Sequence, residues 1–300
     1  MDTRSLSVGF VGAGRAANAL ALGLHDIGYR VTSVASSTLA SAENLAGRIE
    51  GCTPHPTPQE VADGCDLVFI TTPDDAIAAI ARNVRWHSEM GVVHCSGAET
   101  ASLLEAAQEC GAMIGSFHPM QTFPITNLGA ASLSGVAFAV EGPSDLIDTL
   151  KEMAHALGGW PVEIGPQYRA LYHLSGFLAC GAVITLVSQA AELWNVMGYT
   201  KEQGLEVLLP ILRSTVASLE AQGTPAALTG PISRGDVGTV RKHLDALEGQ
   251  APSMIPIYCE IALGTVAMSR DKRGIDHAKE QEMRTLLEDR LARARTLFVV

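Results

Sequence analysis

Residues 8–20, with the sequence VGFVGAGRAANAL, decide the fold of this chain. A short apolar run ends in a glycine-rich turn, and an alanine- and leucine-rich helical pattern follows directly. Gly12 permits a tight turn, Gly14 removes the side chain where a pyrophosphate would approach, and Ala17 allows close packing of helix on strand. The free backbone N–H groups at the start of such a helix attract phosphate oxygens. The stretch therefore predicts a dinucleotide-binding fingerprint rather than a purely structural turn.

The end of the second predicted strand, residues 29–37, indicates which dinucleotide binds. An acidic residue that would hold an unmodified ribose is expected about twenty residues after the first glycine. No Asp or Glu occurs between Asp26 and Glu43. Hydroxyl groups and a cation are available instead, from Ser36, Ser37, Thr38 and Arg15. Because an acid would repel a 2′-phosphate and an arginine would attract it, the pattern favours NADP. The alternative is that Arg15 is solvated and the serines cap the next helix.

The composition limits the class of protein. With 300 residues, 47% of them hydrophobic, the chain is long enough for two domains with a large aliphatic core. A net charge of −11 argues against general binding to nucleic acids or anionic membranes. The six cysteines are scattered and form no Cys-x-x-Cys pair, so we expect no metal site and no disulfide framework. The N-terminus lacks an apolar signal core, and we therefore expect a cytoplasmic protein.

Three further apolar strands, at residues 66–70, 92–94 and 114–118, end in polar residues. Ligands of open α/β sheets bind at the carboxyl ends of the strands, so the residues there are candidates. With the glycine turn, the predicted cofactor contacts are Gly12, Ala13, Gly14, Arg15, Ala16, Ala17, Thr71, Thr72, Pro73, His94, Ser96 and Gly97. Two more strands, at 136–140 and 162–164, complete the pattern. The sequence predicts an α/β Rossmann domain with a doubly wound parallel sheet over residues 1–165.

From residue 166 the pattern changes to long helices, which predicts an all-α domain for substrate binding and dimerisation over residues 166–300. Residues 171–191 contain no formally charged side chain, a length that raises the possibility of a transmembrane helix. We expect instead a helix buried inside the all-α domain, because polar residues interrupt the run and no second span accompanies it. Residues 200–203 form a predicted capping box. The apolar surface of this domain predicts a homodimer.

Histidine is the leading candidate for proton transfer. A nicotinamide reaction needs a group that gives or takes a proton at the substrate heteroatom. No lysine occurs before Lys151 or between Lys151 and Lys201. We therefore predict His118, at a strand end, and His173, on the first helix of the second domain, as catalytic together with Ser175. The alternative for each histidine is a buried, hydrogen-bonded residue of the core.

The substrate is expected to be a small molecule, with predicted contacts at Ser96, Gln121, Tyr172, Arg234 and Asp236. Arg234 lies in a loop shaped by glycine and proline, where it could bind a carboxylate bidentately. The alternatives are that Arg234 and Asp236 form a structural pair, or that Asp236 is the N-cap of the next helix.

Several motifs together resemble a known family. They are GAGR at 12–15, TPDDAI at 72–77, HCSG at 94–97, HPMQTF at 118–123, LYH at 171–173 and ALTGPISRGD at 227–236. The combination, which runs from about residue 7 to 247, resembles the Rossmann-like NADP oxidoreductases with a C-terminal domain of unknown function 2520. The resemblance implies an NADP-binding domain followed by a helical domain similar to those of ketopantoate reductase and pyrroline-carboxylate reductase.

Two departures separate this chain from that family. Cys180 and Gly181 stand where the family usually has Ser-Asn, and Ser218 stands where asparagine is common. The substrate is therefore open. We expect an NADP(H)-dependent oxidoreductase that reduces a C=O or C=N bond of a small carboxylate-bearing metabolite, in the manner of ketopantoate reductase. The alternatives are a non-catalytic NADP-binding sensor or partner subunit, and an NAD-dependent dehydrogenase that works in the oxidative direction.

Overall fold

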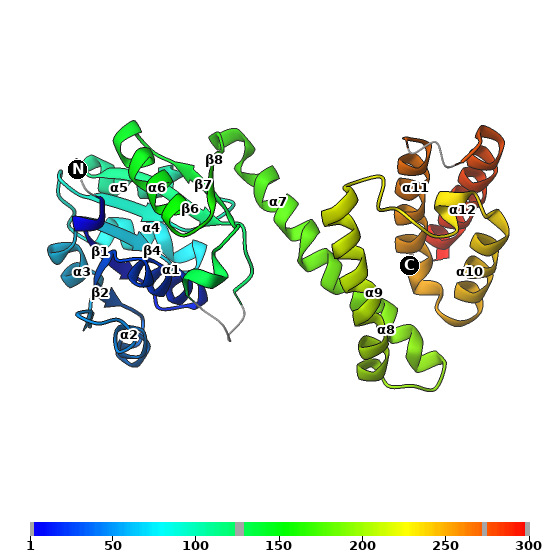
Figure 1. Cartoon of the computed structure of the whole chain (residues 1–300), viewed down its shortest axis with the longest axis horizontal. Helices are drawn as coiled ribbons and strands as arrows, with labels where there is room; N and C mark the ends of the chain where they lie inside the picture. The colour runs from blue at the N-terminus through cyan, green and yellow to red at the C-terminus, as the bar shows by residue number, and fades with distance from the viewer. Residues whose placement is uncertain (1–2, 124–128, 272–274, 298–300) are drawn as a thin grey trace. The chain divides into compact units, whose positions relative to one another are not determined.

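The computed structural model describes residues 3–123, 129–271 and 275–297 of the chain (Figure 1). Its internal contacts divide the chain into two compact units, residues 1–181 and 182–300. The sequence placed the domain boundary after residue 165. The difference is due to helix α7 (Arg169–Ala179), whose contacts belong to the first unit.

An eight-stranded sheet forms the centre of the first unit, in the order β3-β2-β1-β4-β5-β6-β7-β8. The strands are β1 (Ser7–Val11), β2 (Arg30–Ala35), β3 (Thr53–His55), β4 (Leu67–Ile70), β5 (Gly91–His94), β6 (Met113–Pro119), β7 (Ala137–Glu141) and β8 (Trp160–Glu163). Strands β1 to β6 are parallel, which confirms the predicted Rossmann sheet. Strand β7 is antiparallel to β6, since the described part of their connection contains only the short 3₁₀ helix η3 (Ala130–Ser132) and no crossover helix.

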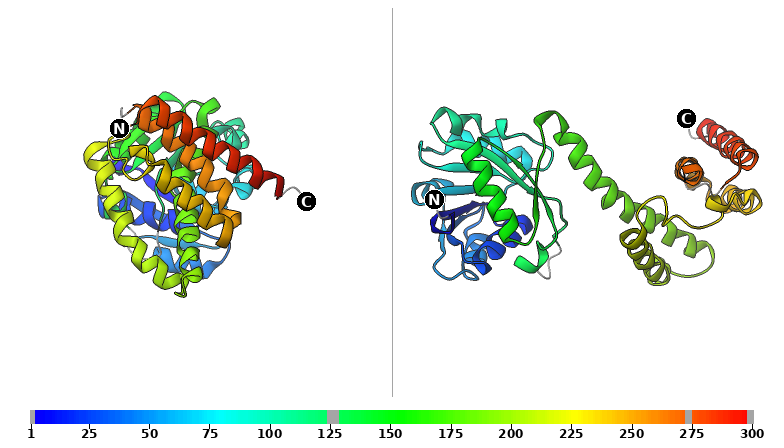
Figure 2. Two further views of the ribbon diagram at one scale, coloured as in Figure 1. Left: turned by 90° about the vertical axis from the view of Figure 1, so that its right-hand side faces the viewer. Right: turned by 45° about the horizontal axis from the view of Figure 1, so that its top comes forward.

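Helices cover both faces of this sheet (Figures 1 and 2). On one face lie α1 (Arg15–Asp26), α2 (Leu39–Ala46) and α6 (Ser144–Ala156), and on the other lie α3 (Pro58–Gly64), α4 (Asp74–Asn83) and α5 (Glu105–Glu109). Under the first group, four buried phenylalanines from β1, β4, β6 and β7 form a row across the sheet: Phe10, Phe69, Phe117 and Phe138. Their large buried rings fix the strands whose ends carry the candidate site.

The second unit is all-α, as the sequence predicted. Its helices are α8 (Gly181–Val196), α9 (Lys201–Gln222), α10 (Val237–Gln250), α11 (Ile255–Asp271) and α12 (His277–Leu297). The last three pack around one apolar core that contains the fully buried Leu244, Val266 and Leu287. Helix α9 begins with the predicted capping box, in which the Thr200 and Gln203 side chains each accept a hydrogen bond from the other's backbone N–H.

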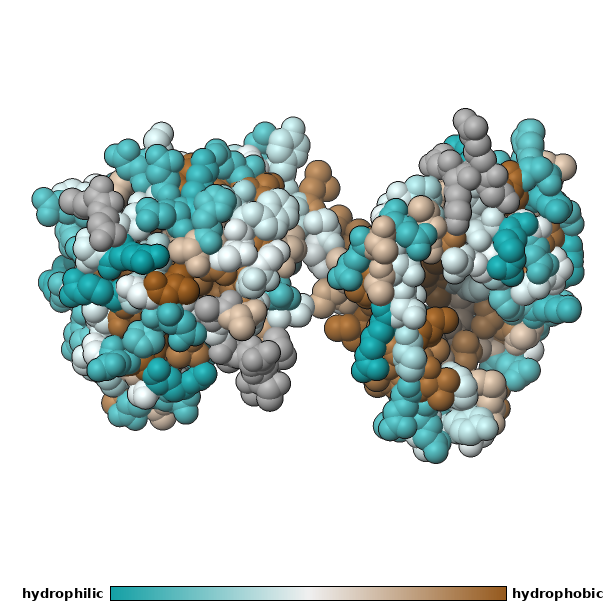
Figure 3. Space-filling model, in the orientation of Figure 1, coloured by the Kyte–Doolittle hydropathy of each residue, from teal (hydrophilic) through white to brown (hydrophobic). Residues whose placement is uncertain are grey.

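The apolar helical run does not lie inside a core. Among the described residues, one helical stretch, Pro166–Val196, is long and apolar enough to cross a membrane, with a hydropathy of 1.8, and none of its most apolar window is buried. Leu171 is 63% exposed, and Ile184 on α8 and Ile211 on α9 are each 65% exposed. Apolar side chains are visible on the surface of the second unit in Figure 3. The expectation of a buried helix is therefore wrong for the single chain, because apolarity predicts burial without specifying the partner.

Candidate functional site

The glycine turn connects β1 to α1 at the carboxyl edge of the sheet. Gly12 has φ 112°, and a Cβ there would lie 2.8 Å from the Thr71 backbone, so only glycine fits. Gly14 is different, because no atom lies within 4 Å of the position that its Cβ would take. No side chain caps the start of α1. Free N–H groups that face open space make this turn fit for a phosphate group.

Three polar side chains hold the turn in shape. The Asn18 amide donates to the carbonyl oxygens of Ala13 (3.0 Å) and Gly14 (2.9 Å), and Arg48 donates to the Asn18 oxygen (2.8 Å). Thr71 Oγ1 donates to the Gly12 carbonyl at 3.1 Å. The sequence indicated a role for Thr71 but none for Asn18. The sequence signal for Asn18 was its amide side chain in the first turn of a mostly apolar helix.

Hydroxyl groups follow β2 where the sequence predicted them. Ser37 and Thr38 are exposed, and Thr38 Oγ1 lies 2.7 Å from Ser41 Oγ. Arg15 is exposed and forms no ion pair with any described residue. This end of β2 therefore keeps a cation and hydroxyl groups available for an anionic ligand.

His94, at the end of β5, shapes its own loop. It is fully buried, its Nδ1 accepts the Ser96 N–H at 3.2 Å, and its Nε2 therefore donates to the Thr100 carbonyl at 2.9 Å. Burial lowers the pKa of His94 to about 4. Both ring nitrogens of this predicted cofactor contact therefore bond within the protein, where they shape the loop.

Ser96 joins this loop to the start of α4. Its side chain donates to Asp74 (2.8 Å) and accepts the Glu99 N–H (3.2 Å), and the residue is only 5% exposed. The backbone N–H of Ser96 donates to His94 and its carbonyl accepts from Arg169, so each polar group of this predicted ligand contact has a partner within the protein. At the end of the neighbouring β4, Thr72 Oγ1 is buried without a partner among the described residues. An unpaired hydroxyl at this edge fits the predicted ligand contact of Thr72.

Arg169, at the start of α7, contacts the candidate site, although no sequence motif indicated it. It is 1% exposed, and it donates from Nε to the Glu99 carbonyl (3.0 Å) and from Nη2 to the Ser96 carbonyl (2.8 Å). Its Nη1 has no partner in the described part of the chain. Its guanidinium carbon lies 5.8 Å from the centre of the Tyr172 ring. Arg169 therefore clamps α7 to the β5 loop. The sequence signal for Arg169 was its position just before the uncharged residues 171–191.

Both predicted catalytic histidines meet at Gly97. A Cβ on Gly97 would lie 2.7 Å from His118 Nε2 and 2.8 Å from His173 Cδ2, and the two ring centres are 6.2 Å apart. His118 Nδ1 lies 2.9 Å from the Tyr172 hydroxyl. Burial, with smaller effects from Arg169 and the neighbouring histidines, lowers the pKa of His118 to about 4. The structure thus brings together His118, Tyr172 and His173 beside the β5 loop.

Three other predicted residues have different surroundings. The Ser175 hydroxyl donates to the Tyr172 carbonyl of its own helix at 2.6 Å, and Gln121 accepts the neighbouring Thr122 N–H at 2.9 Å. Asp236 uses both carboxylate oxygens as the N-cap of α10, on Thr239 N (3.0 Å) and Thr239 Oγ1 (2.7 Å). These hydrogen bonds lower the pKa of Asp236. The helix-cap alternative therefore describes Asp236, whereas the exposed Arg234 keeps its guanidinium available.

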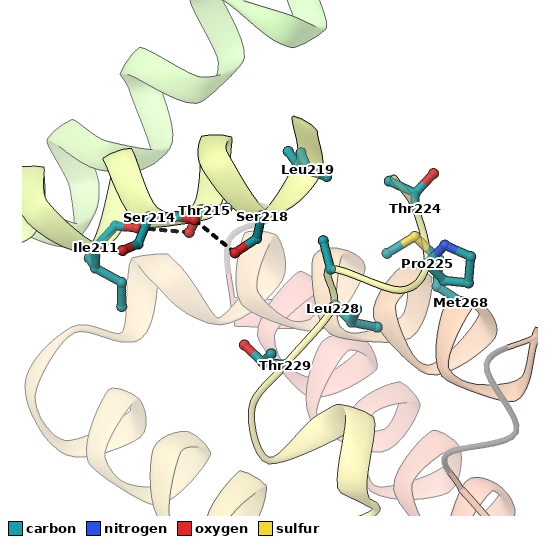
Figure 4. A pocket seen from close by; sticks show the side chains of 11 residues that line it. Ile211, Ser214, Thr215, Ser218, Leu219, Thr224, Pro225, Leu228, Thr229 and Met268 are labelled. Carbon is teal, nitrogen blue, oxygen red and sulfur yellow. Dashed lines mark hydrogen bonds between the residues drawn. The ribbon is translucent and has the colours of Figure 1, made fainter. Parts of the chain in front are cut away.

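The second unit contains a pocket of its own, of about 400 Å³ (Figure 4). Hydroxyl groups from α9 and the following loop line it together with aliphatic side chains, and Met268 contributes from α11. Ser218, one of the positions that departs from the family, lies in its wall and donates to the Ser214 carbonyl at 2.9 Å. No charged residue lines the pocket. The pocket therefore suits an uncharged group and does not by itself explain recognition of a carboxylate.

The sheet order, the glycine turn and the helical second unit define a class, the two-domain Rossmann-like proteins. Within it, residues 1–119 match the Rossmann-like domain and residues 136–265 match the domain of unknown function 2520. The resemblance that the sequence motifs indicated is confirmed. A comparison with curated proteins gives no match.

Solved structures of the same architecture extend this result. A provisionally assigned NADP oxidoreductase from Bacteroides fragilis is 24% identical, with a TM-score of 0.72 over 88% of this chain and 99% of that chain. The pyrroline-5-carboxylate reductase of Streptococcus pyogenes is 14% identical, with a TM-score of 0.61 over 98% and 99%. A reductive aminase from Aspergillus terreus, solved with NADPH, is 16% identical, with a TM-score of 0.60 over 97% and 95%. Identities this low show a common fold.

Proposed function

We propose that this protein is an NADP(H)-dependent oxidoreductase that reduces a C=O or C=N bond of a small carboxylate-bearing metabolite. The observation that carries the proposal is the uncapped start of α1, with open space at Gly14, on the same sheet edge as the imidazoles beside Gly97. The fold is shared with enzymes whose structures hold NADP or NADPH, including a Plasmodium falciparum pyrroline carboxylate reductase. The analogy supports the reaction class and leaves the substrate open.

The residues around the turn are suited to a dinucleotide. The N–H groups at the start of α1 would face the pyrophosphate, and Arg15 with Ser37 and Thr38 would hold the 2′-phosphate. When bound, NADPH supplies a hydride to the substrate. The protein's own contribution is to orient the substrate and to manage one proton, for which His118 and His173 are the candidates.

The test is a comparison of two glycine variants by calorimetric titration with NADPH. Gly14→Val places a branched side chain in the open space at the turn, and we expect NADPH binding to be lost. Gly64→Val is the matched control, because Gly64 also has no atom near its Cβ position but lies at the end of α3. Equal NADPH affinity in both variants would contradict a cofactor site at this turn. A panel of oxo acids and cyclic imines, followed by NADPH absorbance, then tests reduction.

A non-catalytic NADP-binding protein is the second candidate. The observation in its favour is that Gly181 and Ser218 stand where the family has asparagine, while the glycine turn is intact. This candidate predicts tight NADPH binding without consumption on any carbonyl or imine substrate. The third candidate, an NAD-dependent oxidative dehydrogenase, predicts that NADH binds at least as tightly as NADPH.

The exposed apolar helices support a homodimer through the helical domain. Helices α8 and α9 carry many exposed large apolar side chains, and helices in folded proteins owe most of their stability to packing of such faces. A second copy of the chain presents the same apolar surface and would cover it. We propose this arrangement instead of a membrane span, and with it a cytoplasmic location, which the free cysteines of the described chain support.

A further inference from the structure

We propose that Tyr172 and His118 form a relay, in which the Tyr172 hydroxyl donates to His118 Nδ1 and His118 presents its Nε2–H group to the substrate heteroatom beside Gly97. The inference rests on the proposed reductase function, because it assigns the proton that the reduction requires. It makes His118 the catalytic residue and gives Tyr172, which the sequence suggested as a substrate contact, a positioning role.

The relay assigns the one hydrogen of the Tyr172 hydroxyl to the nearer of two acceptors. The Tyr172 hydroxyl has one hydrogen and two possible acceptors, His118 Nδ1 at 2.9 Å and the His118 carbonyl at 3.3 Å. The nearer acceptor makes the stronger bond. The rings meet edge to face, with centres 5.5 Å apart and planes at 87°, which holds the imidazole in one orientation. A neutral imidazole that accepts at Nδ1 carries its hydrogen on Nε2.

The Nε2 atom faces the loop that follows β5. The position of a Gly97 Cβ is 2.7 Å from His118 Nε2, so any larger residue at this position would displace the imidazole. Arg169 fixes the loop at this distance, because it holds the carbonyls of Ser96 and Glu99 on either side of the glycine. Since Arg169 and Tyr172 lie one turn apart on α7, one helix sets both the loop and the relay.

The charged and titratable groups around His118 keep its ring neutral. Burial is the main cause, and the Arg169 cation, His173 and His94 act in the same direction, so that the pKa of His118 falls to about 4. An imidazolium is therefore absent at neutral pH. In the relay, neutral His118 donates its Nε2–H proton, and the Tyr172 hydroxyl 2.9 Å from Nδ1 replaces it.

The proton balance of the relay closes with one proton from water. The reductant is NADPH, and the substrate heteroatom gains one proton as its double bond is reduced. For a carbonyl, the His118 Nε2–H bond breaks as the product O–H bond forms, and the Tyr172 O–H bond breaks as Nδ1–H forms. The tyrosinate then takes a proton from water. Burial raises the pKa of Tyr172 to about 12, which is still below that of a simple alcohol, so transfer to an alkoxide is downhill.

Nitrogen NMR of the full-length protein with ¹⁵N-labelled histidine tests the relay without any substrate. His118→Asn identifies the His118 signals. We expect a neutral ring with hydrogen on Nε2 between pH 5 and pH 8, a window that lies above a pKa of about 4. In Tyr172→Phe we expect a mixture of tautomers, whereas Tyr168→Phe, an exposed tyrosine nearby, should leave the signals unchanged. Hydrogen on Nδ1 in the parent, or an unchanged tautomer in Tyr172→Phe, would overturn the relay.

Turnover provides the second readout. With an accepted substrate, Tyr172→Phe should lower kcat by about tenfold or more, with little change in KM or in the Kd for NADPH. A loss confined to KM would show a substrate contact and overturn the relay. Failure to bind NADPH would contradict the proposed function, whereas a wrong His118 tautomer in a protein that binds NADPH would contradict the relay alone.

Discussion

His94 and His118 lie at the ends of the neighbouring strands β5 and β6, yet their ring nitrogens face different groups. Both His94 nitrogens are bonded within the β5 loop, whereas His118 has Tyr172 on one side and the Gly97 backbone on the other. The first arrangement builds a loop, and the second leaves a donor for chemistry.

The first prediction at the residue scale concerns turnover. His118→Ala should lower kcat by about 10²–10⁴-fold, because it removes the group that supplies the proton. His173→Ala should cost less, since His173 is exposed and no tyrosine hydroxyl bonds to its ring in the described part of the chain. Steady-state kinetics with NADPH measures both, with His87→Ala on the surface as the control. If both variants stay within a few-fold of the parent, the catalytic assignment is wrong.

The second prediction at this scale concerns pH and stability. His94 and His118 have a folded pKa of about 4 against an ordinary value of 6.5, so between these values the unfolded chain binds more protons than the folded chain. Stability is therefore complete above about pH 6.5 and is lost as the pH falls toward 4. Thermal unfolding from pH 7.5 to 4.5 should show a shallower loss in His94→Gln than in the surface control His87→Gln. Equal slopes would refute this origin of acid sensitivity.

The third prediction at this scale concerns cofactor choice. Arg15→Ala should weaken NADPH binding by about tenfold, the size of one charge-assisted hydrogen bond, and leave NADH binding unchanged. Arg4→Ala, an exposed arginine before β1, serves as the control. Titration calorimetry of both cofactors gives the ratio. An equal loss for NADH and NADPH would show that Arg15 does not contact the 2′-phosphate.

At the scale of elements, the start of α10 separates a structural role from a binding role. Asp236→Ala removes the N-cap and should lower the free energy of unfolding by about 1 kcal/mol, because the Thr239 N–H then loses its partner. Asp236→Asn keeps a capping oxygen and should retain most of that stability. Chemical denaturation measures both. Unchanged stability in Asp236→Ala, with a raised KM for substrate, would favour the substrate contact that the sequence suggested.

At the scale of the whole molecule, the prediction concerns the apolar surface of α9. Ile211→Glu puts a charge on a side chain that is 65% exposed in the single chain and that a second copy would cover. We expect the parent to be a dimer by light scattering and this variant to dissociate. Leu39→Glu, an exposed leucine on α2 of the first unit, is the matched control and should remain a dimer. A monomeric parent would refute the dimer.

The sequence by itself determined the architecture and much of the turn. Alternating apolar strands and helices, the glycines at 12 and 14 and the capping signals at Thr200 and Asp236 act over a few residues, so local patterns reveal them. The apolarity of residues 171–191 was equally visible, but apolarity does not say which surface covers a helix.

Only the tertiary structure decided which polar residues form the site. Arg169, Gly97 and His118 lie on separate elements, and their contacts depend on how α7 packs against the ends of β5 and β6. Tertiary packing also bonds the side chains of His94 and Ser96 to groups within the protein, which no sequence pattern indicated. Periodicity reports which face of an element is apolar, whereas the distance between two polar atoms on distant elements is set only when the chain has folded.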